Sequence, residues 1–310
     1  MTAVTAATAV TAVTAATERT PSVFVAGAGP VATAFAGALR HAGAPVLGLW
    51  GRRPEAARRA GAVAGVAAFS AAPPDLLLEA DVILLAVRDE AIGEVARLLC
   101  DTGLVTRRHL LLQCSGAARA HDTLGDVRDR VGGLGTLHPL RSIVDPREAA
   151  ATMAGTVFGV EGDDAGRRAA LALVRILRGR ALDLRGETMA LYHAAASLAS
   201  NFVVALLDAA SEALSAAGLG REEALAALLP LARGTLDNLA RAGLPAALTG
   251  PIARGDAETV DRHLVALAEQ APGILPAYRA LGLRAVDLAR ARSGDSPTLT
   301  RLAAKLAGRE

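Results

Sequence analysis

The sequence predicts an α/β protein with a doubly wound parallel sheet, followed by an all-helical C-terminal domain. In the first half of the chain, short and wholly apolar segments alternate with helical segments, which is typical of a parallel sheet covered on both faces. Beyond residue 187 the strand pattern stops and long segments with helical periodicity follow. We therefore predict domains at residues 21–186 and 187–310, and we expect the Thr/Ala/Val-rich residues 1–20 to form a disordered tail.

The predicted elements of the first domain come in a regular order. Strands are expected at 22–29, 44–50, 80–87, 109–117 and 131–139, helices at 31–43, 54–63 and 89–99, and two further strands at 156–162 and 180–186 with a helix between them. The second domain is expected to hold one long helix that ends at Gly218, then helices at 221–241, 256–269, 273–293 and 298–308.

Composition excludes several classes of function. The net charge is only +2 and the basic residues are dispersed, which argues against a nucleic-acid partner. We find no uninterrupted apolar run of the roughly 18 residues that cross a membrane, so no membrane association is expected. Cys100 and Cys114 show no metal-ligand spacing. We therefore expect no metal site, and a reducing, cytoplasmic location.

A glycine motif follows the first predicted strand. Gly27, Gly29 and Ala32 fit the pattern G-x-G-x-x-G/A between a strand and a helix. The first glycine permits the tight turn, the second lets the backbone approach a pyrophosphate, and the small third residue lets the helix pack close to the strand. This pattern predicts a Rossmann-type dinucleotide site at Gly27, Ala28, Gly29, Pro30 and Val31. The alternative is a glycine turn that serves packing alone.

The end of the second predicted strand indicates which dinucleotide is bound. NAD-preferring proteins usually carry an acidic residue there, but this chain has Arg52 and Arg53. Guanidinium groups suit a 2'-phosphate, so we predict NADP (NADPH) as the cofactor. The alternative is that one or both arginines form a solvated helix start.

Two further strand ends are expected at the same edge of the sheet, where ligands bind in such folds. Val87 and Arg88 follow one strand, and Ser115 and Gly116 follow the next. We predict that these residues contact the cofactor, with a simple turn as the alternative at Ser115 and Gly116.

Histidines supply the candidate proton-exchange groups. His138 precedes Pro139 at the end of a predicted strand, and imidazole has an unperturbed pKa of about 6.5. His193, Ser197 and Asn201 are spaced i, i+4, i+8, which places them on one face of a continuous helix. We predict catalytic or substrate-orienting roles for these four residues. The alternatives are a strand cap for His138 and a structural hydrogen-bond network for the other three.

The segments GAGPVATAF, VRDEAI, CSGA, LHPL, YHAAASLASN and LTGPIARGD carry a family resemblance. The chain resembles NADP-binding oxidoreductases in which a Rossmann-like domain precedes a helical domain of unknown function. It is more distantly similar to 6-phosphogluconate and β-hydroxyacid dehydrogenases, pyrroline-5-carboxylate reductase, ketopantoate reductase and prephenate dehydrogenase. The β-hydroxyacid relatives use a lysine that this chain lacks, since Lys305 is its only lysine. Prephenate dehydrogenases carry a similar His-Pro whose histidine contacts the reacting hydroxyl.

These observations predict an NADP-dependent oxidoreductase that transfers a hydride to or from a carbonyl, imine or hydroxyl carbon of a small polar substrate. His138 or His193 would exchange the proton. A non-catalytic NADP-binding sensor or scaffold and a prephenate-like dehydrogenase are the alternatives. The apolar helices of the second domain and the resemblance together predict a homodimer that forms through that domain.

Overall fold

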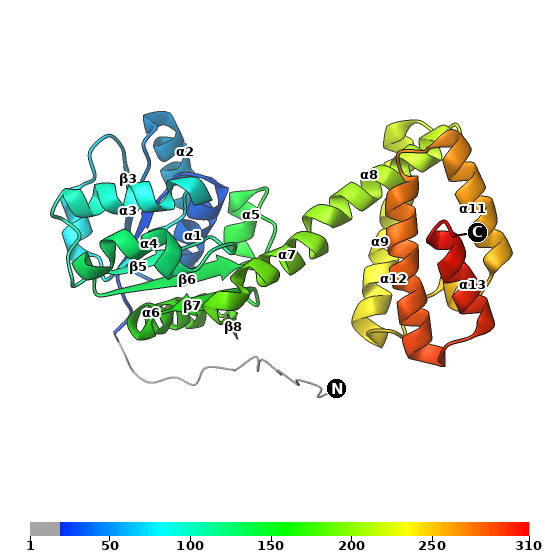
Figure 1. The fold of residues 1–310 in the computed structure, drawn as a ribbon. Helices are drawn as coiled ribbons and strands as arrows, with labels where there is room; N and C mark the ends of the chain where they lie inside the picture. The colour runs from blue at the N-terminus through cyan, green and yellow to red at the C-terminus, as the bar shows by residue number, and fades with distance from the viewer. Residues whose placement is uncertain (1–18, 310) are drawn as a thin grey trace. The chain divides into compact units, whose positions relative to one another are not determined.

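The computed structural model describes residues 19–309, and the chain folds into two compact units, Met1–Leu198 and Ala199–Glu310 (Figure 1). The predicted disordered tail lies outside the described residues except for Arg19 and Thr20, and Arg19 forms an ion pair with Asp81 at 2.6 Å. The division between the units falls later than residue 186. Helix α7 (Met189–Ala199) buries Met189 and Tyr192, and the Tyr192 hydroxyl contacts residues of the first unit.

Within the described residues the first unit contains a sheet in the order β3-β2-β1-β4-β5-β6-β7-β8. The strands are β1 (Val23–Ala26), β2 (Val46–Trp50), β3 (Ala68–Phe69), β4 (Val82–Leu85), β5 (Leu110–Gln113), β6 (Gly133–Pro139), β7 (Val157–Gly162) and β8 (Arg180–Asp183). Every neighbouring pair is parallel except β6 and β7, which pair antiparallel. The predicted doubly wound, Rossmann-type sheet is confirmed, with a reversal of direction at β7.

Helices cover both faces of this sheet. One buried cluster joins the sheet to α1 (Pro30–His41), α2 (Pro54–Ala64), α5 (Pro146–Ala151) and α6 (Asp164–Ile176). The other joins it to α3 (Ile92–Asp101) and α4 (Ala120–Leu124). Short 3-10 helices lie at η1 (Asp75–Glu79), η2 (Asp89–Ala91), η3 (Gly125–Arg130) and η4 (Gly186–Thr188). Apolar burial on both faces explains why the strands read as continuous hydrophobic runs.

The register of the central strands brings their carboxyl ends to one edge. Ala26 of β1 pairs with Leu85 of β4, and Leu85 pairs with Gln113 of β5. Gln113 pairs with Thr136 of β6, so β6 continues beyond its neighbour and carries His138 past the strand end. The glycine turn, the residues after β4 and β5, and His138 therefore share one edge of the sheet.

The second unit is helical. It contains α8 (Asn201–Ala216), α9 (Arg221–Ala242), α10 (Gly250–Arg254), α11 (Ala257–Gln270), α12 (Leu275–Ser293) and α13 (Pro297–Leu306). A small core that includes Val260, Val286 and Leu302 holds the last three helices together. The predicted single helix over 187–218 is wrong in one respect, because Ser200 has non-helical dihedral angles (φ −125°, ψ −77°) between α7 and α8.

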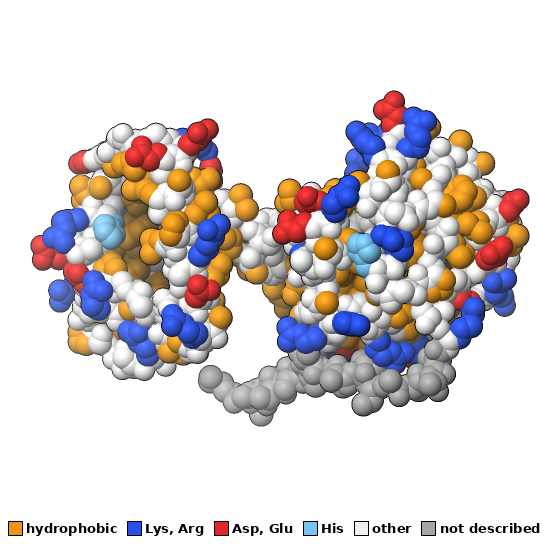
Figure 2. Space-filling view, turned by 180° about the vertical axis from the view of Figure 1, so that it is seen from behind, with side chains coloured by type: hydrophobic (Ala, Val, Ile, Leu, Met, Phe, Trp, Pro, Cys, Tyr) orange, Lys and Arg blue, Asp and Glu red, His pale blue; other side chains and the backbone are white. Residues whose placement is uncertain are grey.

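Apolar side chains are exposed along this part of the chain. The helical segment Gly186–Ala216 is long and apolar enough to cross a membrane, judged by length and composition alone, and only 6% of its most apolar window is buried. Polar residues such as His193, Ser197 and Asn201 interrupt the apolar run of this segment, so no membrane span is predicted from the sequence alone. Figure 2 shows a hollow lined with hydrophobic side chains in the helical unit, which corresponds to a cavity of about 710 Å³.

Candidate functional site

The glycine turn has the geometry that its sequence predicts. Gly27 has φ +146°, a conformation that side chains rarely adopt, and a Cβ on this residue would overlap the carbonyl oxygen of Ala86. At Gly29, by contrast, an added Cβ would meet no atom within 4 Å. Gly27 is therefore required by the packing of the turn on the residue after β4. No contact within the described residues requires the missing side chain of Gly29, so the backbone there is open to a ligand.

The N-terminus of α1 offers hydrogen-bond donors beside this open space. The first intrahelical bond runs from the Thr33 N–H to the Gly29 carbonyl, so the N–H groups of Val31 and Ala32 have no intrahelical acceptor. No acidic residue lies in the first turn of the helix, and no side chain caps it. Such a helix start favours an anionic group such as a phosphate.

A cavity of about 810 Å³ opens around the turn. Its lining includes Gly27, Ala28, Gly29, Pro30, Val31, Trp50, Gly51, Arg52, Arg53, Val87 and Arg88, so the structure brings together all the predicted cofactor residues except Ser115 and Gly116. The volume suits a ligand larger than a mononucleotide phosphate. The residues present therefore fit a dinucleotide in three ways. Gly27 permits the tight turn, Gly29 leaves space beside the backbone, and the start of α1 has N–H groups without an intrahelical acceptor.

The arginines of this cavity are exposed and weakly paired. Arg52 lies 3.3 Å from Glu94 and Arg88 lies 3.1 Å from Glu90, and about half or more of each of these side chains is exposed. Exposed pairs of this kind contribute roughly 0–1 kcal/mol. Both guanidinium groups therefore remain available to an anionic ligand at low cost.

Ser115 and Gly116 follow β5 and are not among the residues that line this cavity, but they contact other residues of the same edge. The Ser115 hydroxyl donates to Asp89 at 2.9 Å and accepts from the Ala117 N–H at 3.2 Å. A Cβ on Gly116 would lie 2.9 Å from the His138 ring. Ser115 thus stabilises a turn and holds Asp89, while Gly116 makes room for the imidazole.

His138 packs against helix α7 in the same unit. Its Nδ1 lies 2.8 Å from the Tyr192 hydroxyl, and the two rings meet edge to face. The His193 ring lies 5.9 Å from the His138 ring, measured between centroids. The structure therefore brings both predicted histidines together at the carboxyl edge of the sheet.

The environment of His138 changes its protonation. Burial, the largest cause, and the neighbouring His193 together lower the pKa of His138 to about 4, while Asp89 acts in the opposite direction. The imidazole is therefore neutral near pH 7. The pKa of His138 thus departs from the unperturbed value of about 6.5 on which its predicted role was based, and a catalytic role for His138 stays a prediction.

His193 is the least satisfied polar side chain of the cluster. Its Nδ1 is buried and has no hydrogen-bond partner in the structure. A buried polar atom without a partner costs about 1–3 kcal/mol, and it calls for an explanation in any folded protein. A bound polar molecule would supply the missing partner.

Only part of the predicted row of polar residues lies on α7. His193 and Ser197 lie on α7, but Asn201 begins α8 after the break at Ser200 and belongs to the second unit. The i, i+4, i+8 spacing assumed a continuous helix, and the non-helical Ser200 removes that premise for Asn201. Asn201 is exposed, and the structure does not place it with the two histidines.

Sequence reasoning missed Tyr192 as a member of this cluster, and it did not link Asp89 to the histidines. Tyr192 stands directly before His193 in the segment YHAAASLASN, and Asp89 follows Arg88 at the end of β4. Their positions beside the predicted residues were the available signal. No metal-binding group of three or more His, Cys, Asp or Glu side chains occurs within residues 19–309.

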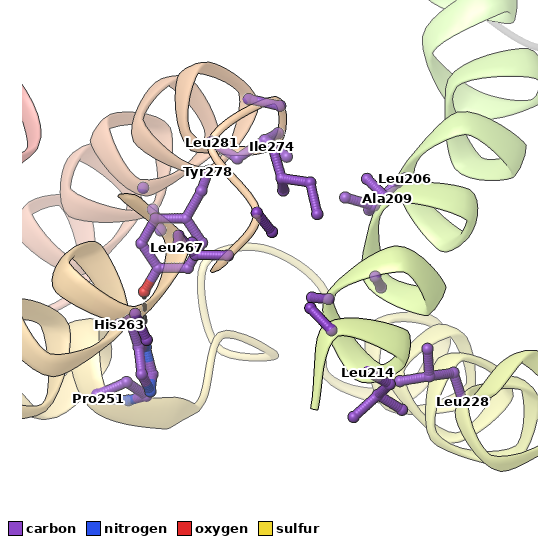
Figure 3. Close-up of a pocket in the computed structure, with 18 of the residues that line it drawn as sticks. Leu206, Ala209, Leu214, Leu228, Pro251, His263, Leu267, Ile274, Tyr278 and Leu281 are labelled. Atoms are coloured by element: carbon purple, nitrogen blue, oxygen red, sulfur yellow. Dashed lines mark hydrogen bonds between the residues drawn. The ribbon is translucent and has the colours of Figure 1, made fainter. Parts of the chain in front are cut away.

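The cavity of about 710 Å³ in the helical unit is a separate feature. Figure 3 shows Leu206 and Ala209 of α8 across the cavity from Ile274 and Leu281. Its polar lining includes His263, whose Nδ1 lies 2.8 Å from the Tyr278 hydroxyl. Apolar side chains dominate its walls.

Two family models match separate parts of the chain, and the second match spans the boundary between the two structural units. Residues 22–110 match the family described as NADP oxidoreductase, coenzyme F420-dependent. Residues 156–285 match a domain of unknown function, DUF2520. No curated protein matches the chain in sequence.

Solved structures show the same fold at low sequence identity. A protein of Thermotoga maritima superposes with a TM-score of 0.68 at 24% identity, over 87% of this chain and 99% of the other. An NADH-preferring ketol-acid reductoisomerase from an uncultured archaeon gives 0.61 at 15% identity, over 94% and 95% of the two chains. A pyrroline carboxylate reductase of Plasmodium falciparum with NADP bound gives 0.55 at 13% identity, over 92% and 98%.

Proposed function

Because the chain joins an NADP-oxidoreductase domain to a DUF2520 domain, we propose that it is an NADP-dependent oxidoreductase acting on a small polar substrate. The observation that carries the proposal is the cavity around Gly29, where an open glycine, a helix start without acidic residues and two arginines meet. When bound, the nicotinamide would supply or accept a hydride at a carbonyl, imine or hydroxyl carbon.

The chain's own residues would bind the cofactor, orient the substrate and exchange the proton. The turn from Gly27 to Val31 would hold the pyrophosphate through backbone N–H groups, and Arg52 and Arg53 would hold a 2'-phosphate. His138 and His193 would face the reacting centre, where one of them exchanges the proton. Ser197 would orient the substrate from the same helix as His193. An orienting role for Asn201 stays a prediction.

The preference for NADP is tested with single substitutions of the two arginines. We expect Arg52→Ala and Arg53→Ala each to weaken NADPH binding by about 10-fold, since a hydrogen bond to a charged group contributes roughly 1.5–3 kcal/mol and these side chains are exposed. NADH binding should change little, because NADH lacks the 2'-phosphate.

Arg58→Ala is the matched control, since Arg58 is an exposed arginine of α2 that does not line the cavity. Equal losses of NADPH and NADH affinity in the Arg52 and Arg53 variants would refute the assignment of these residues to the 2'-phosphate.

We also propose that the helical unit pairs with a second copy of the chain. Phe202, Val204 and Leu206 of α8 are 57%, 71% and 48% exposed, and no charged residue occurs between Thr188 and Asp208. Phe202 and Leu206 share one face of α8 and Val204 lies on the opposite face, and exposed apolar surface of this extent is uncommon on a monomer in water. Leu206 also lines the apolar cavity of about 710 Å³, together with other residues of α8.

A further inference from the structure

The pair formed by His138 and Tyr192 leaves the two nitrogens of the imidazole in different situations. Nδ1 is held by the Tyr192 hydroxyl at 2.8 Å. Nε2 has no hydrogen-bond partner among residues 19–309, and it is not one of the buried polar atoms without a partner. Nε2 is therefore the nitrogen that remains open to a ligand.

The direction of the hydrogen bond at Nδ1 follows from the phenol. Burial raises the pKa of Tyr192 to about 12, so the hydroxyl keeps its proton at neutral pH. The hydroxyl oxygen also lies against the backbone of Gly159, where an added Cβ would come within 2.7 Å of it.

A phenol hydroxyl is a strong hydrogen-bond donor and a weak acceptor, whereas the unprotonated nitrogen of a neutral imidazole is a strong acceptor. The Tyr192 proton therefore points to Nδ1 of His138, 2.8 Å away.

A neutral imidazole that accepts at one nitrogen carries its proton on the other. We propose that Tyr192 is a positioning residue that keeps the His138 proton on Nε2, so that this nitrogen donates a hydrogen bond to the oxygen of a carbonyl or hydroxyl substrate. The positioning role rests on the proposed oxidoreductase function, whereas the protonation state of the ring does not depend on it.

The N–H group at Nε2 of His138 restricts the class of substrate that the site favours. A carbonyl or alkoxide oxygen accepts a hydrogen bond, but the nitrogen of an iminium ion carries its own proton and has no lone pair to accept one. His138 therefore matches a centre that bears oxygen. Proton exchange then falls to His193, whose buried Nδ1 has no other partner.

Imidazole NMR of the cofactor-free protein tests the arrangement without any substrate. In the native protein we expect the His138 proton on Nε2, and an Nδ1 signal shifted as for a nitrogen that accepts a hydrogen bond. In Tyr192→Phe the Nδ1 signal should move to the position of an unbonded nitrogen. A proton on Nδ1 in the native protein, or an unchanged Nδ1 signal in the variant, would overturn the proposal.

The chain offers a matched control for this experiment. His263 Nδ1 and the Tyr278 hydroxyl form a second pair at the same distance of 2.8 Å in the helical unit. Tyr278→Phe should move the His263 signal and leave that of His138 in place. If Tyr192→Phe does not fold, the native spectrum alone still decides which nitrogen of His138 carries the proton.

Kinetics separate this proposal from the proposed function. Tyr192→Phe should lower kcat by about 10-fold with little change in KM, as expected for one lost hydrogen bond in the transition state. Turnover confined to iminium substrates would overturn the donor role. Absence of turnover with carbonyl, hydroxyl and imine substrates alike would refute the oxidoreductase function and the role of Tyr192 in it, while the NMR result would still decide the state of the ring.

Discussion

The lowered pKa of His138 predicts how the stability of the first unit depends on pH. The pKa falls from 6.5 in the unfolded chain to about 4 in the folded protein, so the folded state binds fewer protons between these values. The stability contributed by the neutral, buried ring is complete above pH 6.5, and it is lost as the pH falls toward 4. From pH 7 to pH 5 the expected loss from this residue is about 2 kcal/mol.

The assay uses the single tryptophan of the chain. Trp50 is buried in β2, so its fluorescence during urea unfolding reports on the unit that contains His138. The free energy of unfolding is measured at pH 7 and at pH 5 for the native protein and for His138→Asn, which cannot titrate in this range.

The difference between the two proteins isolates His138 from the other titrating groups. Burial also lowers the pKa of His109, and that contribution is present in both proteins. The groups that face His138 are His193, Tyr192 and Asp89, and all three remain in the variant. If both proteins lose the same stability between pH 7 and pH 5, the environment described for His138 is incorrect.

Two further predictions follow from the glycine turn and from the apolar helix. Gly29→Ala should leave the thermal midpoint nearly unchanged, because the added methyl meets no protein atom, but it should weaken NADPH binding at least about 10-fold. Gly27→Ala should lower both the thermal midpoint and the affinity for NADPH. Calorimetry and thermal unfolding distinguish these outcomes, and undiminished NADPH affinity in Gly29→Ala would contradict the placement of the phosphates. Val204→Glu should convert a homodimer to a monomer in sedimentation experiments, whereas Val144→Glu, at an exposed valine of the first unit, should not. A native protein that sediments as a monomer would refute the dimer, and native protein that floats with lipid vesicles would point to a membrane as the partner of α8.

The sheet was predictable because its signals are local. Each central strand is apolar along its length, and the G-x-G-x-x-A pattern lies between a strand and a helix as it must. The reversal at β7 was not predictable, since the antiparallel pairing of His138 with Gly159 leaves no trace in hydrophobic periodicity. The two-residue strand β3 is too short to give a pattern.

The candidate site was also only partly predictable from the sequence. Most of the lining of the cavity around Gly29 was predictable, because strand ends in a parallel sheet meet at one edge, but Ser115 and Gly116 do not line it. The contact between His138 and Tyr192 spans 54 residues of sequence, and the lowered pKa follows from burial that only the folded structure defines. The break at Ser200 was hidden because no Gly or Pro marks it and the residues on both sides continue the helical pattern.

Calorimetric titration of the full chain with NADPH and then with NADH tests the central claim most directly. The glycine turn and the two arginines predict tight binding of NADPH and much weaker binding of NADH. Binding of neither dinucleotide would contradict the account, because the open space at Gly29 and the helix start beside it would then have no ligand to explain them.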